Sequence, residues 1–457
     1  MHQSSGCPDH NRLDERRRSH STASSRQCQQ APVEQEPPVS AYVHLPFCKR
    51  RCYYCDFPVS VVGSKPERPG IQQGMQDYIT LLCREIEATV KVPGPPLGTV
   101  FFGGGTPTLV PPQLLKQILI ALNNKYGIAK DAEISMESDP GTFDVLRLQE
   151  YMSLGINRFS MGVQCFQQDL LELCGRSHTL EDVYKAINDI HQAGVQNWSL
   201  DLISGLPQLN SKHWQHSLQE AVSAGPTHIS VYDLQVEAKT PFARWYEPGR
   251  HPMPTDEATA DMYRAASQFL QQSGYEHYEI SNYAKPGTRS QHNLGYWRNA
   301  PFYAFGVGAA SYLFQRRFSR PRTMQAYQQW VTEFANCSSS NGPYAGNIPG
   351  IGSMQAEAIE EQLLDYVMLR LRLADGIPMA ELQLKFGHVA AQTVTATLAS
   401  GSAYANKYAR EVYSHGQKHL RLTDPEGFLM SNDCIATLFA ELSSDEGCDP
   451  MLQTSVL

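Results

Sequence analysis

The stretch GTVFFGGGTPTLVPPQLLKQILIALNNKYGIAKDAEISME (98–137) contains the unit that decides the fold. It opens on a short apolar run (98–102), typical of a buried strand, and a glycine-rich turn follows directly. A second apolar run (133–137) closes it. A strand, a helix and a strand joined in this way are typical of a parallel sheet with helices outside it. The intervening helix is predicted from apolar residues at helical spacing, namely Leu114, Leu115, Ile118, Leu119 and Leu122.

The same alternation occurs on both sides of this unit. Further apolar runs predict strands at 41–45, 157–163, 197–203 and 228–234, with helical spacing between them. Six strand–helix units are too few for a closed eight-stranded barrel. We therefore predict an α/β fold with an open, partial (β/α)6 TIM-like barrel, whose functional groups lie at the carboxyl ends of the strands.

The composition restricts the class of protein. The net charge of the 457 residues is −8, so no global basic field recruits nucleic acid or an anionic membrane. No run of about 18 apolar residues predicts a transmembrane segment. The 11 cysteines are an odd number, and the first 40 residues lack the apolar core of a signal peptide. These features predict a cytoplasmic protein with reduced thiols.

The chain is long for one domain, and it divides into four parts. Residues 1–38 are polar and predict a disordered N-terminal extension. Residues 39–325 hold the strand–helix alternation. Residues 326–353, rich in Ser, Gly and Pro from 336 onward, predict a linker or loop. Residues 354–457 predict a smaller C-terminal domain.

Three cysteines follow the first predicted strand, in the segment AYVHLPFCKRRCYYCDF (41–57). They are Cys48, Cys52 and Cys55. A zinc or iron–sulfur site built wholly from protein needs a fourth ligand, and the next residues, Asp56 and Phe57, are not thiols. The fourth ligand is therefore either distant in the sequence or not protein.

Polar residues also mark the ends of other predicted strands. The segment GGGTP (103–107) directly follows the second strand, where a plain tight turn is the alternative to a ligand site. Glu137 closes the third strand, Gln164 follows the fourth, and Asp201 lies in the fifth. Because separate elements bring these groups to one rim, we predict a binding site there.

The CxxxCxxC spacing after the first strand, with the glycine-rich turn after the second, resembles the radical S-adenosylmethionine (radical SAM) superfamily. In that superfamily three thiolates hold a [4Fe-4S] cluster, and the open iron binds the amino and carboxylate groups of S-adenosylmethionine. The resemblance implies both cofactors, a barrel of the radical SAM type, and Cys48, Cys52 and Cys55 as the metal ligands. A zinc site, with a distant fourth ligand, is the alternative.

Further motifs occur in the order seen in the HemN/HemW family, which includes anaerobic coproporphyrinogen III dehydrogenases and haem chaperones. They are FFGGGTPT, ESDPGTF, RFSMGVQCF, GRSH, DLISGLP and SVYDLQVEAKTPF. The backbone donors of Gly105 and Thr106 suit a ligand carboxylate, and Arg176 can bind one through two hydrogen bonds. For Arg176 and Asp201 taken singly, a structural ion pair is the alternative. Matched by position, the resemblance implies S-adenosylmethionine contacts from Tyr42, Tyr54, Gly104, Gly105, Thr106, Glu137, Gln164, Arg176 and Asp201.

Two features favour the haem-chaperone branch of this family. The dehydrogenases have a further cysteine, CxxxCxxCxC, where this chain has Phe57. The HNxxYW segment from His292 to Trp297 resembles the chaperones. Imidazole is a common axial ligand of haem iron, and aromatic rings suit an apolar macrocycle, although a histidine that only forms hydrogen bonds is the alternative.

We therefore predict a haem chaperone that binds haem near His292 and transfers it to an acceptor protein. The alternative is an oxygen-independent coproporphyrinogen III dehydrogenase. An electron donor is a further expected partner if radical chemistry occurs.

The C-terminal part predicts helices over 357–377 and 379–387, then a strand, a turn and a final helix over 419–439. This order resembles a winged-helix-like domain, as the family has. Basic residues are sparse on the segment that would be the recognition helix, so we expect no nucleic acid there. The domain is predicted to cover the site or to dock a partner.

Overall fold

The structure is a computed structural model that describes residues 36–338, 358–399, 407–414 and 416–444. Almost all of the predicted N-terminal extension (1–38) therefore lies outside the described residues, as does the second half of the predicted linker. The described residues from Glu36 onward belong to one compact unit by their contacts.

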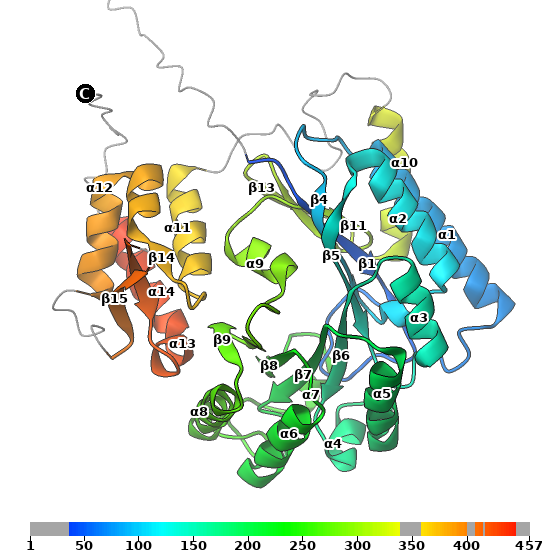
Figure 1. The fold of residues 1–457 in the computed structure, drawn as a ribbon, viewed down its shortest axis with the longest axis horizontal. Coiled ribbons are helices and arrows are strands. Elements are labelled where there is room, and N and C mark those ends of the chain that lie inside the picture. The colour runs from blue at the N-terminus through cyan, green and yellow to red at the C-terminus, as the bar shows by residue number, and fades with distance from the viewer. Residues whose placement is uncertain (1–35, 339–357, 400–406, 415, 445–457) are drawn as a thin grey trace, which may run out of the picture. The chain divides into compact units, whose positions relative to one another are not determined.

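The centre of the fold is a sheet in which all six predicted strands lie parallel and in chain order (Figure 1). Five of them are buried along most of their length, and β5 is buried mainly in its second half, which is why the strands were recognised from apolar runs. The predicted α/β fold with a parallel sheet is confirmed. The strands are β1 (Ser40–Leu45), β4 (Leu97–Gly104), β5 (Ile128–Ser138), β6 (Arg158–Gln164), β7 (Trp198–Ser204) and β8 (His228–Asp233).

Three strands that the sequence analysis did not predict extend this sheet. β11 (Tyr303–Phe305) pairs parallel with β1, while β10 (Asn282–Ala284) and β9 (Glu276–Glu279) continue antiparallel beyond β8. The nine strands run in the order β11-β1-β4-β5-β6-β7-β8-β10-β9, with β11 and β9 at the two edges.

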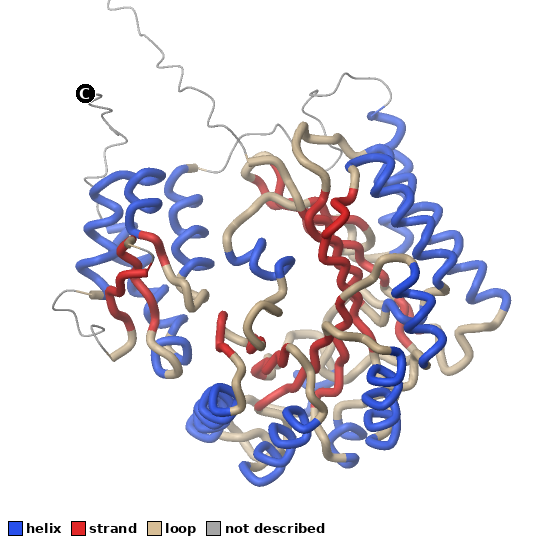
Figure 2. The backbone as a smooth tube through the Cα atoms, viewed as in Figure 1, coloured by secondary structure: helices blue, strands red, loops and turns tan. Residues whose placement is uncertain are grey.

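Helices cover the outer face of the sheet (Figure 2). The predicted helical segments correspond to α1 (Pro69–Ala88), α2 (Pro112–Tyr126), α5 (Leu180–Ala193) and α6 (Ser211–Ser223). Their apolar faces join the sheet in one core, which includes Leu82 and Ile118. The other helices on this side are α3 (Val145–Ser153), α4 (Gln168–Leu173), α7 (Pro241–Trp245) and α8 (Asp256–Gln272).

The helix starts follow local sequence. Thr179 caps α5 with a capping box that also uses Asp182, and Asn210 and Thr255 cap α6 and α8 with their side chains. These caps satisfy backbone N–H groups that have no partner within the helix.

The concave face of the sheet is covered in part by α9 (Gln291–Trp297), which contains the HNxxYW segment. Figure 1 shows α9 facing the sheet on the side opposite α1 and α2. A hairpin of β12 (Ala310–Leu313) and β13 (Arg316–Ser319) follows, and then α10 (Met324–Ser338) packs on α1. Because α10 extends to Ser338, the first part of the range predicted as a linker (326–353) is helical.

The C-terminal part contains the predicted helices, strand and final helix, and it also contains two strands that were not predicted, β14 (Ile377–Pro378) and β15 (Ala409–Ser414). α11 (Ile359–Arg370) and α12 (Met379–Leu398) pack with α14 (Ser431–Ser444), and helical geometry breaks at Gly387, where the predicted second helix ends. A three-stranded sheet of β14, β16 (Gln417–Leu422) and β15 completes it, with α13 (Glu426–Leu429) after β16. Contacts such as Arg264 Nε to Glu426 Oε1 at 2.7 Å join this part to α8.

Candidate functional site

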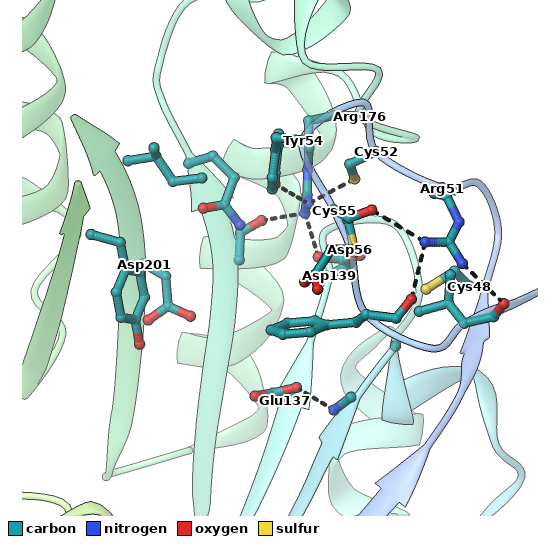
Figure 3. A pocket seen from close by; sticks show the side chains of 18 of the residues that line it. Cys48, Arg51, Cys52, Tyr54, Cys55, Asp56, Glu137, Asp139, Arg176 and Asp201 are labelled. Carbon is teal, nitrogen blue, oxygen red and sulfur yellow. Dashed lines mark hydrogen bonds and ion pairs between the residues drawn. The ribbon is translucent and has the colours of Figure 1, made fainter. Parts of the chain in front are cut away.

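A cavity of about 480 Å3 lies at the carboxyl ends of the parallel strands. Figure 3 shows the loop with the three cysteines on one side of it and the carboxylates Glu137, Asp139 and Asp201 at the strand ends. Ten of the thirteen predicted site residues line this cavity: Cys48, Cys52, Cys55, Tyr54, Gly104, Gly105, Glu137, Gln164, Arg176 and Asp201. The rim predicted from the strand ends is therefore one site in the structure.

The cysteine loop is held by backbone contacts to several elements. Cys48 ends the short strand β2 (Phe47–Cys48), which pairs with β3 (Ser60–Val61). The Tyr53 N–H donates to the Cys174 carbonyl at 2.9 Å. Arg51 Nη1 donates to the carbonyls of Cys55 (3.2 Å) and Phe57 (3.0 Å), which fixes the end of the loop. All three thiols are free and half-buried.

The donor set fits an iron–sulfur cluster that is held by three thiolates. No fourth thiol and no imidazole is among the residues that line the cavity. In the described ranges, no three His, Cys, Asp or Glu side chains meet as ligands of a single metal ion. Burial, and next the nearby Asp139 carboxylate, raise the pKa of Cys48 to about 12, and burial also raises the pKa of Cys55. Metal binding would therefore have to displace protons from these thiols.

The glycine turn after β4 is required by close packing against the cysteine loop. A Cβ on Gly105 would lie 2.6 Å from the Phe47 carbonyl oxygen, and Gly104 has a φ of +114°. The Gly105 N–H donates to the Leu45 carbonyl at 2.9 Å, and the Thr106 N–H donates to the Phe47 carbonyl at 2.7 Å. The two backbone donors predicted for a ligand carboxylate thus bind the cysteine loop in this structure.

Two carboxyl groups at the cavity floor have raised pKa values. Burial is the main cause for Glu137, whose pKa is about 8 despite the 2.8 Å hydrogen bond from the Gly104 N–H, with Asp201 and Asp139 adding to the increase. Burial also raises the pKa of Asp201 to about 6, although Ser160 Oγ donates to it at 3.1 Å. These groups can accept hydrogen bonds from an ammonium or from ribose hydroxyls, and they attract a cation once they ionise.

Arg176 has a different partner from the one that the sequence analysis proposed for it. Its Nη2 lies 2.5 Å from Asp139 Oδ1 and donates to the Gly162 carbonyl at 2.8 Å, while Nη1 donates to the Tyr54 hydroxyl at 3.0 Å and to Cys52 Sγ at 3.3 Å. The structural ion pair, given above as the alternative for Arg176, is present. Asp139 was missed, although it stands two residues after Glu137 within the ESDPGTF motif.

Three predicted site residues lie behind the cavity lining. Tyr42 stacks on Phe101, with its hydroxyl 3.1 Å from His44 Nδ1. The Thr106 hydroxyl, which is buried, lies 3.0 Å from Asp139 Oδ2 and 3.9 Å from Cys48 Sγ. Thr106 therefore lies close to the site, whereas Tyr42 packs against Phe101 and His44 outside the cavity lining.

His292 is the third of these residues, and it is 1% exposed. Its Nδ1 lies 2.6 Å from the Thr99 hydroxyl, its Nε2 lies 2.7 Å from the Tyr296 hydroxyl, and its ring stacks on Phe101. Burial, with a smaller effect from Arg158, lowers the pKa of His292 to about 3, so the ring is neutral. In this conformation both ring nitrogens have protein partners, as expected for the hydrogen-bonding alternative.

Comparison with known proteins agrees with these observations. The model of the Radical SAM superfamily matches residues 42–221. The chain is 44% identical over 421 residues to the "Heme chaperone HemW" of Synechocystis sp., covering 89% of this chain and 98% of that protein. It is 35% identical over 350 residues to the "Heme chaperone HemW" of Bacillus subtilis, covering 76% and 87%.

The fold is also similar to a solved structure described as "Coproporphyrinogen III oxidase (HemN) from Escherichia coli is a Radical SAM enzyme". The TM-score is 0.68 at 21% identity, and the match covers 90% of this chain and 91% of the other. At this identity the match supports the fold alone. Among the described residues, none of the helices is long and apolar enough to cross a membrane.

Proposed function

This chain belongs to the radical SAM superfamily, in the family of the HemW haem chaperones, and from that membership we propose that it binds haem and transfers it to an acceptor protein. The observation that carries the proposal is the convergence of three cysteines on one cavity. A chaperone that retains the cluster site of the superfamily is expected to retain such a cavity.

In this proposal Cys48, Cys52 and Cys55 hold a [4Fe-4S] cluster, which supplies an open iron for the amino and carboxylate groups of S-adenosylmethionine. The remaining cavity residues orient the second cofactor. Glu137 and Asp201 would attract its sulfonium charge, which would otherwise lose favourable hydration in the cavity, and would accept hydrogen bonds from its ribose hydroxyls. Tyr54, Gly104 and Gln164 also line the cavity, so the bound cofactor would displace water from the two carboxylates.

Phe57 favours a chaperone over a dehydrogenase. The side chain is 57% exposed and lines the cavity directly after the cysteine loop. At this position the dehydrogenase motif requires a further thiol, and a phenyl ring cannot replace its chemistry. Haem, an acceptor protein and, for any reductive step, an electron donor are the partners that this reading requires.

The first experiment measures both cofactors on one sample. Anaerobic reconstitution is expected to give about four irons and four sulfides per chain. Haem is expected to bind stoichiometrically and to pass to apomyoglobin, used as a general acceptor. Coproporphyrinogen incubated anaerobically with S-adenosylmethionine and a reductant should yield no decarboxylated porphyrin.

Single substitutions give the matched controls. Cys48→Ser, Cys52→Ser or Cys55→Ser should abolish the cluster, whereas Cys83→Ser, at a half-buried thiol outside the cavity, should leave it intact. A stable zinc site that iron and sulfide do not displace would refute the cluster. Decarboxylated porphyrin would favour the dehydrogenase instead.

A further inference from the structure

Arg176 and Asp139 form an ion pair directly beside the cysteine loop. Their side chains are 6% and 21% exposed, and Arg176 Nη2 lies 2.5 Å from Asp139 Oδ1. At such exposure, solvent and salt screen the two charges only weakly. Figure 3 shows Arg176 beside Cys52, and Asp139 directly follows β5, which ends at Ser138.

Arg176 is fixed by contacts to three separate elements. Nη2 also donates to the Gly162 carbonyl of β6, and Nη1 donates to the Tyr54 hydroxyl and to Cys52 Sγ at 3.3 Å. The guanidinium is therefore positioned against the Cys52 sulfur by the protein itself. A hydrogen bond from a charged donor to a sulfur is among the strong contacts that such a site can contain.

Cys48 lies near the negative charge of Asp139, whereas Cys52 lies beside the positive charge of Arg176. The Thr106 hydroxyl has one proton and two acceptors, Asp139 Oδ2 at 3.0 Å and Cys48 Sγ at 3.9 Å. The proton goes to the nearer and charged carboxylate, so Cys48 receives little stabilisation from this hydroxyl. The Asp139 carboxylate is therefore separated from the Cys48 sulfur by one hydroxyl group.

We propose that the Arg176–Asp139 pair sets the reduction potential of the iron–sulfur cluster and positions Cys52 for it. The inference rests on the cluster of the proposed function. The reduction transfers one electron from a reductant such as dithionite to the oxidised cluster and breaks no bond. Net charge and hydrogen bonds to the sulfurs determine such potentials, so Arg176 favours the reduced state and Asp139 opposes it. Arg176 is a positioning residue in this role.

The test is an anaerobic potentiometric titration of reconstituted protein, followed by electron paramagnetic resonance. Asp139→Asn should raise the midpoint potential and Arg176→Met should lower it. Each change should alter the ratio of reduced to oxidised cluster at a fixed potential about tenfold, which is 59 mV for a one-electron couple. The double variant removes both charges and should return close to the wild-type potential.

Two controls separate this role from a general effect on folding. Arg370→Met and Glu381→Gln break an ion pair of similar exposure in the C-terminal part and should leave the potential unchanged. Arg176→Lys retains the charge without the forked contacts, so it should shift the potential less than Arg176→Met. If Arg176→Met takes up no iron, Asp139→Asn and Arg176→Lys decide the outcome.

Unchanged potentials in Asp139→Asn and Arg176→Met, or shifts in the same direction, would overturn the inference. A double variant whose midpoint potential is lowered as far as that of Arg176→Met would also overturn the inference. A wild-type protein that forms no cluster at all would refute the proposed function instead, and the two failures are therefore distinguishable.

Discussion

At the scale of single residues, burial raises the pKa values of two thiols of the cavity, Cys48 and Cys55, and of two carboxyls, Glu137 and Asp201. The raised pKa values of Glu137, about 8, and Asp201, about 6, mean that both groups are largely neutral at pH 5. As the pH rises, Asp201 loses its proton first and Glu137 second. The cavity thus becomes more negative over a range in which the sulfonium of S-adenosylmethionine keeps its positive charge, since a sulfonium has no proton to lose.

We expect the affinity for S-adenosylmethionine to increase between pH 5.5 and pH 8.5, by about tenfold for each carboxylate that forms. Isothermal titration calorimetry of the reconstituted protein would measure this. Glu137→Gln should abolish the upper part of the increase, whereas Glu237→Gln, at the exposed rim of the same cavity, should retain it. Affinity that is independent of pH would contradict the placement of the sulfonium near these groups.

A substitution of His292 tests whether the HNxxYW segment contributes to packing of the core or to haem binding. Its ring is buried between two hydroxyl partners and Phe101, so His292→Ala removes hydrogen bonds and leaves a cavity. We expect the free energy of unfolding to fall by roughly 2–4 kcal/mol in chemical denaturation. Thr99→Val, which removes one partner only, should cost less. A shifted Soret band of the haem complex with unchanged stability would instead assign His292 to the iron.

At the scale of elements, the glycine turn after β4 allows the cysteine loop to approach the sheet. Gly105 has no room for a side chain, because backbone atoms of Pro46 and Phe47 lie within 3 Å of the position of a Cβ. Backbone atoms cannot rotate away as a flexible side chain can. The glycine turn and the cysteine loop therefore cannot move independently, although about 50 residues separate them in sequence.

Gly105→Ala is accordingly expected to displace the loop and to lower the iron content after reconstitution severalfold. Gly70→Ala is the matched control, because a Cβ there would meet nothing within 4 Å and the residue lies in the first turn of α1. That control should keep full iron content and a stability equal to or slightly above wild type. Equal iron content in both variants would show that the turn does not position the loop.

The arrangement of these elements was predicted in large part from local patterns. The six parallel strands and their covering helices follow from apolar runs and helical spacing, and the sites at the strand ends follow from the parallel topology. The edge strands β9, β10 and β11 were missed because each has only three or four residues, too short for a periodic signal. α9 has only seven residues, and its sequence does not show that it covers the concave face.

At the scale of the whole molecule, a buried ion pair connects α1 to a segment more than 200 residues later in the chain. Glu85 of α1 is 0% exposed and pairs with Arg320 at 2.8 Å. It also accepts hydrogen bonds from the Gly306 N–H at 2.9 Å and from the Tyr327 hydroxyl at 2.5 Å. These contacts hold α1 against the segment after β11 and against α10, beside the edge of the sheet.

Removing this carboxylate should leave the Arg320 charge buried without its partner. We expect Glu85→Ala to lower the free energy of unfolding by about 3–5 kcal/mol. Glu87→Ala, an exposed position on the same helix, should change it by less than about 0.5 kcal/mol. Urea denaturation followed by circular dichroism would compare the two variants. Similar stability of both would mean that the pair contributes no net stabilisation.

The sequence by itself determined the parallel sheet, the cysteine loop and the glycine turn, because each depends on side chains that are close along the chain. Strand–helix alternation requires only local periodicity, and the CxxxCxxC spacing places three thiols on one loop wherever that loop folds. Only the tertiary structure decided that Arg176 pairs with Asp139 and that the ring nitrogens of His292 face Thr99 and Tyr296. Partners such as Thr99 and His292, 193 residues apart, meet through packing of the whole sheet, and no local pattern specifies which of several polar groups is nearest.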